Sequence, residues 1–136
     1  MGASAVLLIC SVLEDGRLKA YHQLADELGL SALVETHNEE EILRAQKIGA
    51  KIIGVNNRNL KDFTVDIKNS IRLREMVSSE TVFVSESGIR GVEDMKALYE
   101  NGTDAVLIGE LLMRKSDLKA ALIELKQQTG RQLDMN

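Results

Sequence analysis

Two hydrophobic patterns alternate along this chain. Short runs of aliphatic and β-branched residues recur five times, and longer amphipathic segments lie between them. The runs are apolar throughout, which is typical of strands that are covered on both faces. Strict alternation of such strands with helices predicts a parallel sheet, either doubly wound or closed into a (β/α)₈ barrel. The expected strands are residues 5–10, 32–36, 51–55, 81–85 and 105–109.

The amphipathic segments carry the start and stop signals of helices. Leu18, Tyr21 and Leu28 belong to one apolar stripe that Gly29 ends. Asn38, with a glutamate three residues later, is a capping-box pattern. We therefore expect one α/β domain over residues 1–136, in which each strand is followed by a helix. The expected helices are residues 17–30, 38–50, 66–77, 91–102 and 117–128.

Polar residues gather just after the strands, at the face where parallel α/β folds bind ligands. A single acid at a strand end is more often a helix cap than a catalyst. Four consecutive strands with polar ends favour a functional site. The residues concerned are Glu35 after the second strand, Asn56, Asn57 and Arg58 after the third, Glu86, Ser87 and Gly88 after the fourth, and Gly109 and Glu110 after the fifth.

The ends of the last two strands predict a phosphate site. Ser87-Gly88 and Gly109-Glu110 place small residues where backbone N–H groups emerge, so an anion can approach the main chain. The sequence ELLMR after Gly109 is long enough for one short helical turn, whose N–H groups would add donors. Phosphate sites between the last two loops recur in barrel enzymes.

Composition and charge limit the classes of partner that we expect this protein to bind. The net charge of −4 argues against nucleic acid or an anionic membrane as the main partner, and no apolar run in the 136 residues is long enough to span a bilayer. We expect no signal peptide at the start, which has no basic residues before its apolar run. Cys10, the one cysteine, lies in an apolar strand, and two separated histidines make a metal site improbable. A reducing cytoplasm is the expected compartment.

Four stretches resemble one enzyme family. LVETHNEEE, GAKIIGVNNRNLKDFTVD, VFVSESGI and DAVLIGELLMR are similar to indole-3-glycerol phosphate synthase, and the likeness runs over residues 2–125. The resemblance implies a (β/α)₈ barrel of which this chain holds strands 4–8 with their helices. It implies a carbon-carbon lyase (a carboxy-lyase) of tryptophan biosynthesis that closes the indole ring of a phosphorylated substrate, losing carbon dioxide and water, with no metal or organic cofactor.

The resemblance also implies residue roles. Carboxylates steady cationic intermediates, but they serve as the main acid at neutral pH only where burial raises their affinity for protons. The implied roles are Glu35 and Glu86 as active-site carboxylates, Asn56 at the reacting part of the substrate, Arg58 facing its benzoate carboxylate, Leu60 packing on the aromatic ring, and Ser87, Gly88, Gly109 and the backbone of Glu110 around the phosphate.

The chain departs from the family pattern in three ways. Asn59 stands where aspartate is usual, and Leu111 stands where a small hydroxyl residue is common. The two essential lysines of the family come from the first and third barrel strands, which precede the matching region. Five strands cannot close an eight-stranded barrel. We therefore expect the polypeptide to self-associate or to pair with a complementing N-terminal segment, and to have little activity alone.

Two alternatives stay open. A related phosphate-binding barrel enzyme, such as phosphoribosylanthranilate isomerase, would need a different acid/base pair, and an epimerase would need histidines that bind metal at the strand ends. A non-catalytic half-barrel that binds phosphorylated ligands agrees with the missing lysines.

Overall fold

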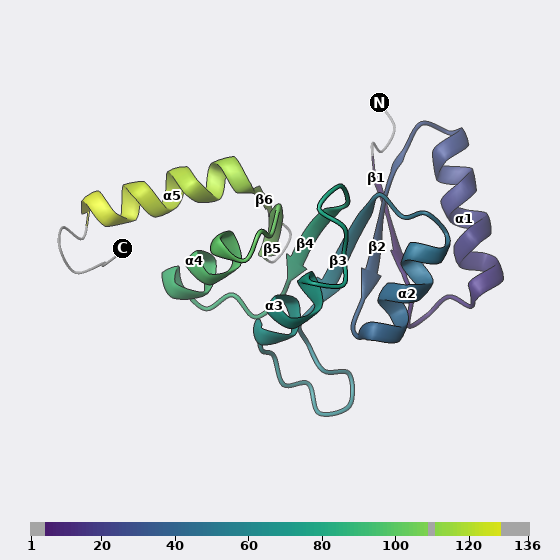
Figure 1. The fold of residues 1–136 in the computed structure, drawn as a ribbon, viewed down its shortest axis with the longest axis horizontal. Coiled ribbons are helices and arrows are strands. Elements are labelled where there is room, and N and C mark those ends of the chain that lie inside the picture. The colour runs from purple at the N-terminus through teal and green to yellow at the C-terminus, as the bar shows by residue number, and fades with distance from the viewer. Residues whose placement is uncertain (1–4, 109–110, 129–136) are drawn as a thin grey trace.

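A computed structural model describes residues 5–108 and 111–128 of the chain (Figure 1). Strands and helices alternate along it until the last strand. The elements are β1 (Ala5–Ile9), α1 (Asp15–Glu27), β2 (Ser31–Thr36), α2 (Glu39–Lys47), β3 (Ile52–Asn56), α3 (Lys68–Arg74), β4 (Val82–Glu86), α4 (Val92–Glu100), β5 (Ala105–Ile108), β6 (Leu111–Arg114) and α5 (Lys115–Gln128).

The strands form one sheet in chain order, β1-β2-β3-β4-β5-β6, and β1 to β5 are parallel. Crossovers between parallel strands are right-handed, so connections that always step to the next strand leave all their helices on the same face. Figure 1 shows α1 and α2 beside β1 and β2, with α4 and α5 grouped at the other end of the curled sheet. This arrangement is an incomplete (β/α)₈ barrel, as predicted.

The two faces of the sheet differ in burial. Val34, Ile53 and Phe83 are neighbours in register, and all three are fully buried in the core between sheet and helices. The adjacent row of the sheet faces the opposite way. In that row Val82 is 42% exposed, and Leu7 of β1 is 50% exposed. The face that lines the inside of a closed barrel is therefore partly uncovered by the described residues.

The end of the sheet corrects one prediction. Leu111–Arg114 forms strand β6, antiparallel to β5, and not the expected helical turn. Ile108 pairs with Leu111 at one end of this ladder, and Ala105 pairs with Arg114 at the other. The antiparallel pairing supplies hydrogen-bond partners to the otherwise free edge of β5.

Most of the predicted helix ends lie close to the ends that the structure shows. Asn38 caps α2, because its Oδ1 accepts the N–H of Glu41 at 2.9 Å. Asp66 accepts the N–H of Lys68, the first residue of α3, so that helix starts later than predicted. The last helix, α5, starts at Lys115, two residues before the predicted start at residue 117. The apolar stripe of α1 is only partly buried, because Leu18 is fully buried whereas Leu28, the C-cap residue, is exposed.

Candidate active site at the strand ends

Two acidic side chains meet at the carboxyl ends of the parallel strands. Glu35 lies near the end of β2 and Glu86 is the last residue of β4, and they are only 7% and 4% exposed. A hydrogen bond to Glu35 is among the causes that raise the pKa of Glu86. Such a bond forms only when one of the two groups is protonated, because an ionised carboxylate only accepts hydrogen bonds. The sheet therefore brings two buried carboxyl groups together.

A glycine on the strand between them makes this contact possible. Gly54 of β3 pairs in register with Glu35, and a Cβ added at Gly54 would collide with Oε2 of Glu86. An isolated glycine in an apolar strand often marks such a close approach. The missing side chain at position 54 leaves the space that the carboxyl of Glu86 occupies above β3.

The pair changes the acidity of Glu86. Burial is the largest cause, and the hydrogen bond and the charge of Glu35 add to it, so the pKa of Glu86 rises to about 8. At neutral pH Glu86 is therefore largely protonated and can donate a proton. Burial of this kind is what allows a carboxyl to hold its proton near neutral pH.

A buried polar network fixes the loop after β4. Asn57 Nδ2 donates to Ser85 Oγ and to the carbonyl oxygen of Ser87, both at 3.0 Å. Its Oδ1 accepts from the backbone N–H and the hydroxyl of Ser70. Ser87 has φ 69°, a left-handed conformation that costs a residue with a side chain about 1 kcal/mol or more. Asn57 thus ties the first loop residue to β3 and α3.

Gly88 completes this loop. Its φ is 81°, and an added Cβ would lie 2.5 Å from Cγ1 of Val65. Both the backbone conformation and the lack of space therefore require glycine here. Ser87 and Gly88, two of the predicted phosphate-binding residues, lie directly after Glu86. Gly109 and Glu110, the other two, lie outside the described residues.

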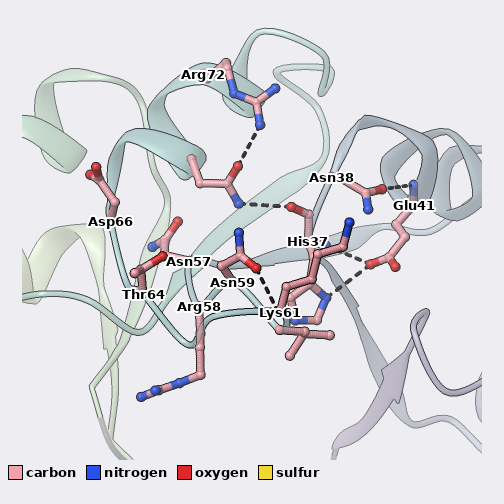
Figure 2. A pocket seen from close by; sticks show the side chains of 12 residues that line it. His37, Asn38, Glu41, Asn57, Arg58, Asn59, Lys61, Thr64, Asp66 and Arg72 are labelled. Carbon is pink, nitrogen blue, oxygen red and sulfur yellow. Dashed lines mark hydrogen bonds and ion pairs between the residues drawn. The ribbon is translucent and has the colours of Figure 1, made fainter.

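The long loop after β3 borders a cavity of about 500 Å³ (Figure 2). Arg58 and Leu60 line it and are exposed, and the guanidinium group of Arg58 points away from His37. Asn56 sits in register with Glu86, and its Oδ1 accepts the N–H of Arg58 at 3.0 Å. The structure thus brings Glu35, Asn56 and Glu86 to neighbouring strand ends, whereas Arg58 and Leu60 line a cavity to which these three residues do not contribute.

Two further residues were not predicted at the site: His37, which lies beside Glu35, and Glu41, which contacts His37. His37 Nδ1 is 3.2 Å from Oε1 of Glu41, and its Nε2 is 3.9 Å from Oε2 of Glu35. The signal that could have found them is a histidine four residues before an acid, at a helix start that follows a strand-end glutamate. Gly54 was also missed, although it interrupts an apolar strand.

Other chemistry is limited in the described part of the chain. No group of three or more His, Cys, Asp or Glu side chains there could hold a metal ion. Burial, the largest cause, raises the pKa of the Cys10 thiol to about 11, which agrees with an inert buried cysteine. None of the helices in the described ranges is both long and apolar enough to cross a membrane.

A profile of the indole-3-glycerol phosphate synthase family matches residues 1–125. This chain belongs to that family. It is 57% identical over 126 residues to the indole-3-glycerol phosphate synthase of Ruminiclostridium cellulolyticum, covering 93% of this chain and 48% of the relative. The corresponding protein of Leuconostoc mesenteroides is 54% identical over 125 residues, covering 92% and 48%. The chain spans about half the length of these synthase relatives.

The fold has a solved neighbour with little sequence likeness. The YdjI aldolase from Escherichia coli K12 superposes with a TM-score of 0.58 at 19% identity, covering 95% of this chain and 50% of the aldolase. This likeness concerns the fold alone, and it too matches the synthase-family chain to about half of a longer protein.

The raised pKa of Glu86 predicts a pH dependence of stability. A carboxyl whose folded pKa lies above its unfolded value makes the free energy of unfolding fall as pH rises from about 4.5 to about 8. The slope is at most about 1.4 kcal/mol per pH unit. Glu86→Gln should flatten this decline in urea denaturation between pH 5 and pH 8.

The control for this experiment is Glu80→Gln, which removes an exposed acid. The pKa of His37 is also raised, chiefly by its hydrogen bond to Glu41, so its stabilising contribution is lost in the same direction and should persist in Glu86→Gln. Equal slopes for the wild-type and Glu86→Gln proteins would contradict the prediction.

Proposed function

We propose that this chain is the C-terminal part of an indole-3-glycerol phosphate synthase and supplies the carboxyl pair and the phosphate end of its active site. The reaction closes the indole ring of 1-(2-carboxyphenylamino)-1-deoxyribulose 5-phosphate with loss of carbon dioxide and water. The observation that carries this proposal is the meeting of Glu35, Asn56 and Glu86 at neighbouring strand ends in a member of the family.

The geometry supports a division of labour between the two acids. Glu86, protonated near neutral pH, is suited to protonate a leaving oxygen. Glu35 as a carboxylate would stabilise the positive charge that develops when the aromatic carbon attacks the ketone. Asn56 would hold the reacting part of the substrate. Arg58 would pair with the benzoate carboxylate through its planar fork of donors, and Leu60 would pack on the ring.

The phosphate would lie at the loops after the last two parallel strands. The Asn57 network and the tight packing of Gly88 hold the first loop in one conformation, which lowers the entropic cost of ligand binding. We assign Ser87, Gly88, Gly109 and the backbone of Glu110 to the phosphate cradle. No metal or organic cofactor is part of this proposal, and we propose a cytoplasmic location.

The partly uncovered face of the sheet indicates what kind of partner segment the chain would need. Among the described residues β1 pairs only with β2, so its outer edge can accept a further strand. We propose that a segment carrying the preceding barrel strands, with the two lysines of the family, covers this edge and face. A non-catalytic half-barrel that binds phosphorylated ligands is the second candidate, because the chain spans about half of its relatives' length.

Phosphate binding is tested by titrating inorganic phosphate into ¹⁵N-labelled protein and following the amide signals of Ser87, Gly88, Gly109 and Glu110. We expect these amides to shift, and Gly88→Ala to weaken binding about tenfold or more, equivalent to about 1.4 kcal/mol, because the added Cβ meets Val65. Gly49→Ala is the matched control, since Gly49 has φ 76° but open space around it. Unmoved amides in the wild-type protein would refute the cradle.

Catalysis is tested by mixing the chain with a separately produced segment that carries the first three barrel strands. Alone, the chain should self-associate, as measured by light scattering, and show no turnover. With the segment, a 1:1 complex should form and convert the carboxyphenylamino-ribulose phosphate, and Glu86→Gln should reduce its kcat by about 100-fold or more. A well-formed complex that binds phosphate without turnover would favour the non-catalytic alternative.

A further inference from the structure

His37 lies between the buried carboxyl pair and the cavity. Oε1 of Glu41 is 3.2 Å from its Nδ1 and also accepts its backbone N–H at 2.8 Å (Figure 2). On the other side, Nε2 of His37 is 3.9 Å from Oε2 of Glu35. This Nε2 is buried and has no hydrogen-bond partner among the described residues. One carboxylate therefore fixes the ring orientation, and the free nitrogen faces the acid pair.

The protonation state of the His37 ring determines whether Nε2 presents a hydrogen-bond donor or a lone pair to Glu35. A cationic ring presents Nε2–H and favours a carboxylate on Glu35, whereas a neutral ring with its proton on Nδ1 presents a lone pair and favours a protonated Glu35. The hydrogen bond to Glu41 is the largest cause that raises the pKa of His37, burial opposes it, and the charges of Glu41 and Glu35 add to the rise. These contacts favour the cation.

Glu41 remains ionised in this arrangement. Burial raises the pKa of Glu41, but the hydrogen bonds from the ring and backbone of His37, with the charges of His37 and Arg44, outweigh burial and lower it. In the arrangement that these contacts favour, a carboxylate at Glu41 and a cation at His37 lie beside Glu35, next to the carboxyl of Glu86, whose pKa is raised.

We propose that His37, oriented by Glu41, is a positioning residue that keeps Glu35 ionised, so that the proton shared by the carboxyl pair stays on Glu86. Only the catalytic meaning of this inference rests on the proposed function. In the proposed synthase reaction, His37 would thus give the two acids different roles. Glu86 would be the proton donor and Glu35 the counter-charge for cationic intermediates.

Other charged groups surround the same cavity from the loop after β3 and from α3. Asn69 links α3 to this site, because its Nδ2 donates to the carbonyl oxygen of His37 at 3.0 Å. Glu35 and Glu41 form the ion pairs to the His37 ring within 4 Å. The remaining charged side chains that line the cavity are Arg58, Lys61, Asp66 and Arg72, of which Arg72 is paired with Glu39.

The test is a pH titration of the full chain by NMR, with ¹⁵N signals of the His37 ring and ¹³C signals of the Glu35 and Glu86 side-chain carboxyls. Glu41→Gln keeps the shape of the side chain and one oxygen but removes the charge, and it should lower the titration midpoint of His37 by about one pH unit or more. His37→Gln should shrink the Glu86 titration step near pH 8 by up to about half, because the proton is then divided between both acids.

His22→Gln is the matched control, since His22 lies on α1 and lines a different cavity, and it should leave both signals unchanged. If His37→Gln fails to fold, Glu41→Gln remains decisive, because it should also shrink the Glu86 step. An unchanged His37 midpoint in Glu41→Gln, or an unchanged Glu86 step in a folded His37→Gln protein, overturns the inference. These titrations need neither ligand nor turnover, so their failure is distinguishable from failure of the proposed function.

Discussion

The contact between Glu35 and Glu86 across Gly54 is the constraint on which the site depends. The two acids lie on strands that are not neighbours, and the carboxyl of Glu86 can extend over β3 because that strand carries no side chain at position 54. Burial then makes the charged form of Glu86 costly, and the charge of Glu35 makes it costlier. The absence of one methyl group, at Gly54, thus allows the two acids to approach each other. His37 and Asn56 matter chemically because they lie beside this pair.

The sheet explains why this site lies at one edge of an incomplete barrel. Parallel strands in chain order bring all their carboxyl ends together, while right-handed crossovers send every helix to one face. The other face keeps exposed apolar residues such as Leu7 and Val82, as the inside of an unclosed barrel would. The same topology therefore creates the acid pair and leaves a surface that a further segment of barrel can cover. The β5 edge is different, since β6 already occupies it.

The sequence predicted the order of elements and the clustering of Glu35, Asn56 and Glu86, because apolar runs, caps and strand ends are local signals. It did not predict β6, since ELLMR is as compatible with a helical turn as with a strand, and only pairing with β5 decides between them. It missed Gly54 because the reason for that glycine is a side chain from β4. It missed His37 because a lone histidine carries no signal until Glu41 and Glu35 are placed around it.

The most direct test of this account is the titration of the Glu86 carboxyl in Gly54→Ala. The added methyl group takes the space of Oε2, so the carboxyl of Glu86 must move from its place above β3. The account predicts that the midpoint of Glu86 falls from about 8 toward the ordinary range near 4.5, in a protein whose amide spectrum remains dispersed. A midpoint that stays near 8 in the folded Gly54→Ala protein would contradict it, because the acid pair would then not depend on the gap in β3.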